Sequence, residues 1–178
     1  MYVTSKPSGS ANHPSVSTDI LPAGYTLISG GAKLDFTCAG NLLVESYPSY
    51  NVWNVVGKDH IYPCAAIATA YAIGIRSQIP GFVGELEFNG NYLRETYQTG
   101  GSGNYYPSYN SDWGWPGRVV TGVGARSTYS PSNSGRLITG LRPNSYLNPS
   151  NDWSSKDCNV PSTSGTLDCW LMVMQKMH

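Results

Sequence analysis

An internal duplication constrains the fold of this chain more than any other feature of its sequence. Residues 13–37 align with residues 106–130 without a gap, and this alignment pairs Gly24 with Gly117 and Gly31-Ala32-Lys33 with Gly124-Ala125-Arg126. With short gaps it continues through Pro48 and Pro143, Trp53 and Trp153, and Lys58-Asp59 and Lys156-Asp157. A repeat of this kind predicts that two copies of one supersecondary unit build the protein.

The composition favours strands and turns over helices. The chain contains 20 Gly, 12 Pro and 13 Tyr among its 178 residues, and these residue types are typical of turns and strands. In the first copy we expect strands at residues 25–29, 32–37, 41–46 and 67–76. The predicted fold class is all-β: an internally duplicated antiparallel β-sandwich or β-prism-like domain with pseudo-two-fold symmetry.

The duplication also predicts the organisation of the chain. Residues 1–12 form an N-terminal arm, residues 13–76 the first β repeat, and residues 106–178 the second β repeat. Residues 77–105 between them contain Asn89-Gly90, a strong hairpin signal, followed by the flexible joint Gly100-Gly101-Ser102-Gly103.

The alanine-rich segment 67–76 suits a helix as well as a strand, because Ile67, Tyr71 and Ile75 recur every four residues. Its counterpart, residues 166–174, is bulky and β-favouring, which predicts a strand in both copies. The alignment matches Trp170 of the second copy to Ala72 of the first. We therefore expect a small face in one half to pack against a bulky face in the other.

Four cysteines lack the CxxC spacing of zinc and thioredoxin-like sites, so neither a metal nor another cofactor is expected. Two disulfides, Cys38–Cys64 and Cys158–Cys169, are predicted because each pair lies within one repeat. The alternative is four buried free thiols.

The charges exclude one class of partner. Eleven basic and eleven acidic residues cancel without any basic cluster, so we expect no nucleic-acid binding. The longest apolar run, residues 64–75, is too short to span a bilayer, and the N-terminus shows no signal peptide. The disulfide prediction favours a secreted or cell-surface location.

The sequence carries none of the common catalytic or nucleotide-binding motifs. Lys58-Asp59-His60, with Cys64 nearby, is the one cluster that suggests a Cys/His site. The second copy keeps only Lys156-Asp157, which indicates a scaffold role instead. We therefore predict a protein that is not an enzyme.

Aromatic and polar residues gathered in three segments carry the functional prediction. Tyr-Pro-Ser-Tyr-Asn occurs twice, at residues 47–51 and 106–110, and a related segment follows residue 143. Aromatic rings stack on the C–H faces of sugars, while Asn and Asp satisfy sugar hydroxyls, so a lectin-like protein that binds a glycan is expected. The expected ligand-binding residues are Tyr105, Tyr106, Tyr109, Asn110, Asp112, Trp113, Trp115, Tyr47, Tyr50, Asn51, Tyr146 and Asp152.

Three alternatives accompany this prediction. Trp53 and Trp153, at matched repeat positions, also suit a structural role in the core. The weakly charged, aromatic surface also suits a self-assembling structural subunit of a coat, fibre or surface layer, and hence a homo-oligomer. A membrane-active toxin is a third possibility, since Tyr- and Trp-rich loops can bind lipid head groups.

Overall fold

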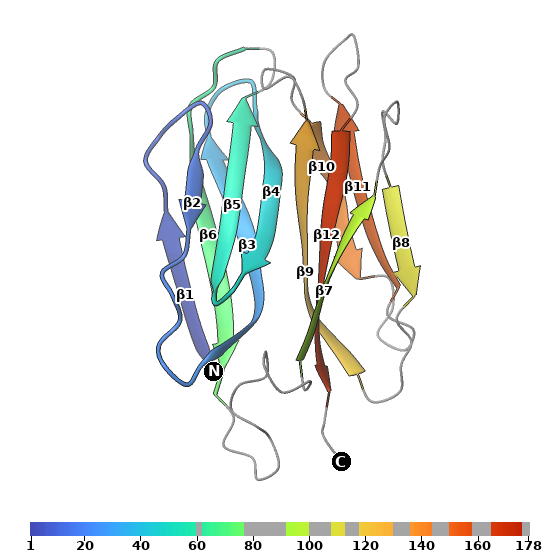
Figure 1. Ribbon diagram of the computed structural model, residues 1–178. Coiled ribbons are helices and arrows are strands. Elements are labelled where there is room, and N and C mark those ends of the chain that lie inside the picture. The colour runs from blue at the N-terminus through green and yellow to red at the C-terminus, as the bar shows by residue number, and fades with distance from the viewer. Residues whose placement is uncertain are drawn as a thin grey trace.

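A computed structural model describes residues 1–59, 62–76, 92–99, 108–112, 118–129, 136–143, 150–157 and 165–175 of the chain. Every regular element in these residues is a strand, which confirms the all-β prediction (Figure 1). The strands are β1 (Tyr2–Pro7), β2 (Ser15–Ser17), β3 (Thr26–Phe36), β4 (Asn41–Ser49), β5 (Val52–Asp59), β6 (Ala66–Ile75), β7 (Tyr92–Thr99), β8 (Ser108–Asp112), β9 (Arg118–Tyr129), β10 (Arg136–Pro143), β11 (Ser150–Asp157) and β12 (Gly165–Gln175).

The strands form three antiparallel sheets. Two sheets have three strands each, in the orders β1-β6-β3 and β10-β11-β8, and the third has six strands in the order β2-β5-β4-β9-β12-β7. The six-stranded sheet joins strands of both halves through a short pairing of β4 with β9 at Glu45–Arg126 and Ser46–Ala125. The two halves consequently lie side by side (Figure 1).

The N-terminal segment 1–12, expected as an arm, contributes a strand to the first half. Tyr2–Pro7 pairs with β6 along its whole length. The amide of Ser8 then donates to the Ala68 carbonyl at 2.7 Å, and Ala11 bridges to Ala66.

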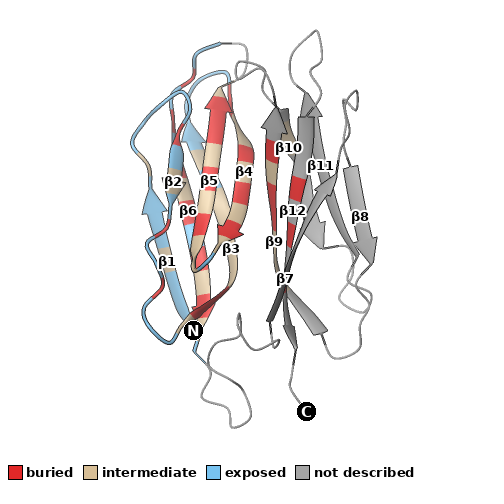
Figure 2. Ribbon diagram, in the orientation of Figure 1, coloured by how far each residue is buried: buried red, intermediate tan, exposed pale blue. Residues whose placement is uncertain are grey.

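Trp53 organises the core of the first half. Its side chain is fully buried between β5 and the sheet β1-β6-β3, where an added Cβ at Gly30 would lie only 2.1 Å from Cδ2 of Trp53. The indole Nε1 donates to Oγ of Ser46 at 2.9 Å, and the Trp53 amide donates to Oγ1 of Thr18 at 3.0 Å. The interpretation of Trp53 as a core residue is therefore confirmed, and Figure 2 shows buried positions alternating along β5.

The predicted strand at residues 67–76 is confirmed as β6, with its alanine face inside. Ala68, Ala70 and Ala72 are fully buried, whereas Ile67 and Tyr71 face outward. Small residues line the interior because the Trp53 ring fills the space above them. Met172 from β12 joins the same cluster, so the second half contributes one bulky side chain to this core.

The prediction of Cys38–Cys64 is confirmed, because these residues form a disulfide with a Cα–Cα distance of 5.6 Å. The free-thiol alternative is wrong for this pair. Cys158 lies outside the described residues, so the pairing with Cys169 stays a prediction.

Ala72→Leu is expected to lower the free energy of unfolding by about 1–3 kcal/mol, because extra methylenes at a fully packed site force strain. Thr69→Leu, on the outward face of the same strand, is the matched control and should cost much less. Chemical denaturation of both variants measures the difference, and equal losses would contradict the inward placement of the alanine face.

Candidate functional site

The structure describes the predicted ligand-binding residues to different extents. Side chains are described for Tyr47, Tyr50 and Asn51, and the backbone alone, in β8 or β11, for Tyr109, Asn110, Asp112 and Asp152. The other five predicted residues, Tyr105, Tyr106, Trp113, Trp115 and Tyr146, lie outside the described residues.

Tyr50 and Asn51 form the tip of the β4–β5 hairpin and have different roles. The Asn51 side chain accepts a hydrogen bond from the Leu27 amide at 3.2 Å and donates one to the Tyr25 carbonyl at 3.3 Å. Asn51 is therefore committed to holding the hairpin. Tyr50 is 76% exposed and has a φ of 50°, a conformation that bulky residues rarely adopt. The tip thus presents an aromatic ring on a braced backbone.

The register of β8 and β11 brings together predicted residues that are far apart in the sequence. Asn110 lies directly opposite Asp152, Tyr109 opposite Trp153, and Asp112, the last residue of β8, opposite Ser150, the first residue of β11. Residues directly opposite one another share a face of the sheet. Asn110 and Asp152 are therefore neighbours on one face, and β8 is the edge strand of that sheet.

A second cluster, which the sequence did not predict, lies where the two halves meet. The pairing of β4, β9 and β12 places Glu45, Arg126 and Asp168 in one row across three strands. Arg126 donates to Oδ2 of Asp168 from Nη2 at 2.6 Å and from Nε at 3.0 Å. Asp168 is buried, and its other oxygen, Oδ1, has no hydrogen-bond partner among the described residues.

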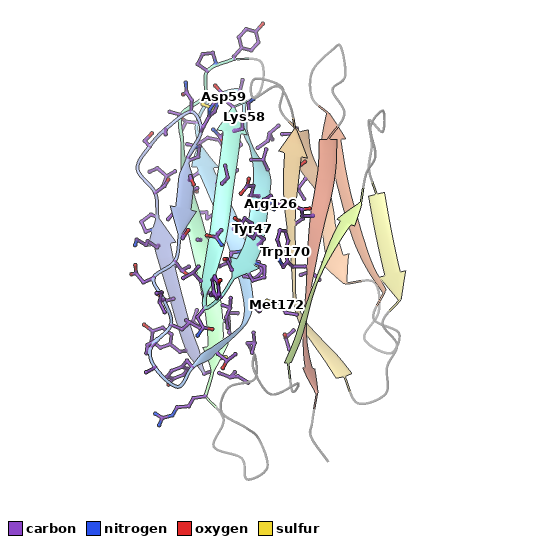
Figure 3. All side chains as sticks on the ribbon, in the orientation of Figure 1. Tyr47, Lys58, Asp59, Arg126, Trp170 and Met172 are labelled. Atoms are coloured by element: carbon purple, nitrogen blue, oxygen red, sulfur yellow. A yellow bond between two sulfur atoms is a disulfide. The ribbon has the colours of Figure 1, made fainter. Side chains whose placement is uncertain are left out.

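An aromatic stack completes this cluster. The rings of Tyr47 and Trp170 stack at 4.6 Å between centroids, and the Arg126 guanidinium lies 5.3 Å and 5.5 Å from the two rings (Figure 3). Gly124 of β9 lies opposite Trp170, and an added Cβ there would lie 2.9 Å from the Tyr47 Cα. The glycine therefore allows Tyr47 to reach Trp170. Tyr47, predicted as a ligand contact, is engaged in an internal contact.

The charges of the cluster are coupled. Burial lowers the pKa of Arg126, but the hydrogen bond and charge attraction of Asp168, with a smaller contribution from Tyr47, raise it overall. Burial raises the pKa of Glu45; attraction to Arg126 opposes this effect and repulsion from Asp168 reinforces it. These contacts make the cluster a structural ion pair. Groups of three or more His, Cys, Asp or Glu that could hold a metal are absent from the described residues.

The Lys58-Asp59 pair, considered above for catalysis, lies at the end of β5 (Figure 3). Oδ1 of Asp59 is 2.8 Å from Nε2 of His13, and the Asp59 amide donates to the Asn12 carbonyl at 3.0 Å. Cys64 is in a disulfide and supplies no thiolate. These contacts fix the segment that precedes β2 against β5.

Comparisons with known proteins give no relative for this chain: no family model, curated protein or solved structure matches it. None of the described residues forms a helix that is long and apolar enough to cross a membrane.

Glu45→Gln is expected to raise the thermal midpoint at about pH 7. The pKa of Glu45 in the folded protein lies above its ordinary value of 4.5. The fold therefore favours the protonated carboxyl, whose contribution to the free energy of unfolding is complete below pH 4.5 and is lost as the pH rises through the raised pKa. Gln keeps the shape without the charge, so its advantage should disappear toward about pH 4.

Calorimetry across this pH range measures the effect. Asp19→Asn, at a side chain that is 75% exposed, is the control and should give no comparable gain. A midpoint below that of the wild type at neutral pH would contradict the assignment of a buried, destabilising charge.

Proposed function

We propose that this protein is a non-enzymatic, lectin-like binding protein whose ligand is a glycan. The observation that carries the proposal is the β8–β11 register, which makes Asn110 a neighbour of Asp152 at an edge strand. The segments that contain Trp113 and Trp115 on one side, and Tyr146 on the other, connect to Asp112 and Ser150, which lie opposite each other. In this proposal the aromatic residues of these segments and the pair Asn110 and Asp152 serve one sugar-binding site.

The proposed contact set follows from this placement and from the hairpin tip. Tyr47 and Asn51 are omitted because the fold uses their side chains. The proposed ligand contacts are Tyr50, Tyr105, Tyr106, Tyr109, Asn110, Asp112, Trp113, Trp115, Tyr146 and Asp152. The disulfide supports a secreted or cell-surface location, since such bonds persist in oxidising compartments.

We propose in addition that the architecture is a duplicated β-sandwich. Strand pairing supports this, because β1-β6-β3 and β2-β5-β4 have the counterparts β7-β12-β9 and β8-β11-β10. Bulges support it too: the irregularity after Leu43 has its counterpart after Ile138, and the bulge at Ile28 has one at Thr121. In this scheme β7, within the segment expected as an insert, corresponds to β1.

A glycan array on the purified protein tests the binding proposal. Trp113→Ala and Asp152→Asn should each weaken the signal at least about tenfold, the usual cost of losing a stacking or hydrogen-bonding contact of about 1.4 kcal/mol. Tyr62→Ala is the control, because Tyr62 is 67% exposed elsewhere in the molecule. The absence of any glycan signal from the wild type would overturn the proposal.

A self-assembling structural subunit is the second candidate, and the outward face of the sheet β1-β6-β3 supports it. Val3 is 57% exposed and lies opposite Ile73, and the exposed Tyr71 and Ile67 lie further along the same face of β6. Exposed apolar patches of this kind mark contact surfaces. Sedimentation velocity over a range of concentrations should reveal assemblies larger than the 19.2 kDa chain, and a constant monomer would rule this candidate out.

A further inference from the structure

The contact between the halves has the form of a socket on β9 that strands of the first half occupy. At Gly122 an added Cβ would lie 3.1 Å from the Ile28 carbonyl oxygen, so β3 passes directly over it. At Gly124 an added Cβ would lie 2.8 Å from Cδ of Pro48, so β4 passes over that residue. The Tyr47 ring then stacks on Trp170 beside Arg126. A Tyr-Pro segment thus fills a socket formed by a glycine, an aromatic ring and a cation.

The first half carries the same three elements on its outward face. Gly31 lies opposite Tyr71 just as Gly124 lies opposite Trp170. Lys33 follows Gly31 by two residues, as Arg126 follows Gly124 by two residues. Among the described residues, nothing comes within 4 Å of a Cβ added at Gly31, and Tyr71 is 36% exposed. Gly31 is therefore not needed to accommodate a described neighbour, and its missing side chain leaves room beside the Tyr71 ring.

The sequence itself contains a segment that fits this second socket. Tyr47-Pro48, which cover Gly124, begin the pentapeptide Tyr-Pro-Ser-Tyr-Asn, and the same five residues recur at 106–110. We propose that Tyr106-Pro107 of a second copy of this chain docks on the socket of Gly31, Tyr71 and Lys33. The proposal deepens the assembly candidate and rests on it.

The donor of the segment must be another copy. Tyr106 precedes Ser108, the first residue of β8, by only two residues along the chain. Figure 1 shows β8 and the pair β1–β6 on opposite sides of the molecule. Equal numbers of basic and acidic residues mean that net charge does not oppose contact between copies.

The resulting contact is head-to-tail, because the socket is in the first half and the Tyr-Pro segment is in the second. Contacts of this type extend into filaments or close into rings, of which the two-fold dimer with two reciprocal contacts is the smallest. Each copy carries one socket that its described strands leave open and one second copy of the pentapeptide, so blocking either leaves the other functional.

Two variants and their mixture test the proposal by sedimentation velocity. Gly31→Gln fills the socket with a neutral side chain, and Tyr106→Ala removes the ring that docks. Each variant alone should be monomeric under conditions in which the wild type assembles. Their equimolar mixture should give one discrete 1:1 dimer, since one variant keeps the segment and the other keeps the socket. Gly9→Gln, at another glycine with open space around it, should assemble like the wild type.

The outcomes separate this proposal from the broader one. If the wild type stays monomeric, both the assembly candidate and the docking proposal are contradicted. If the wild type and Gly31→Gln assemble equally well, the docking proposal is overturned but the assembly candidate is not. If Tyr106→Ala fails to fold, a peptide with the sequence of residues 104–112 replaces it. That peptide should bind the wild type at least tenfold more tightly than Gly31→Gln, and equal binding would overturn the proposal.

Discussion

The close passage of β3 and β4 over two glycines of β9 is the contact on which the arrangement of the two halves depends. An added Cβ at Gly124 would lie 2.9 Å from the Tyr47 Cα, and one at Gly122 would lie 3.1 Å from the Ser29 Cα, both tighter than ordinary van der Waals contact. Because the backbones approach this closely, Tyr47 reaches Trp170, and Met172 reaches the core around Trp53. The buried Asp168 is then neutralised by Arg126 at the same contact. If the strands did not approach this closely, the buried Asp168 carboxylate would lose its surroundings and Tyr47 would no longer stack on Trp170.

Trp53 imposes a second constraint on the first half. Its ring packs against Gly30 of β3, and the inward face of β6 in the same core holds only alanine and glycine, so β6 has its larger residues on the outer face. An outward row of Val, Ile and Tyr is therefore a consequence of how the core is filled. This links the interior of the sheet β1-β6-β3 to the surface on which the assembly candidate rests.

Local patterns in the sequence were sufficient for part of this account. The strand at β6, the Cys38–Cys64 disulfide and the core position of Trp53 follow from alternation, spacing and repeat position. Register could not be read in the same way. Under the proposed duplication, Gly31 matches Gly124, so the observed register matches Trp170 to Tyr71 and not to the expected Ala72, a shift of one residue that changes the face.

The site at the junction was missed for the same physical reason. Glu45, Arg126 and Asp168 meet only through the pairing of three strands that are distant in the sequence. Their spacing along the chain does not predict that they lie in one row. The repeated segment Tyr-Pro-Ser-Tyr-Asn predicts ligand binding, but Tyr47 and Pro48 of its first copy pack against the other half. That use of the repeat is what suggests a docking role for the second copy.

The comparison of Gly124→Ala with Gly31→Ala tests the central claim most directly. Gly31 pairs with Tyr71 and Gly124 pairs with Trp170, and of these two glycines only Gly124 is covered by a described strand. In urea denaturation, Gly124→Ala should lose about 2 kcal/mol of unfolding free energy or more, because the new methyl group collides with the backbone of Ser46 and Tyr47 and with the Pro48 ring. Gly31→Ala should lose nothing and gain about 0.5 kcal/mol from the stiffer unfolded chain. Equal effects of the two substitutions would contradict the claim that the halves are held together over Gly124.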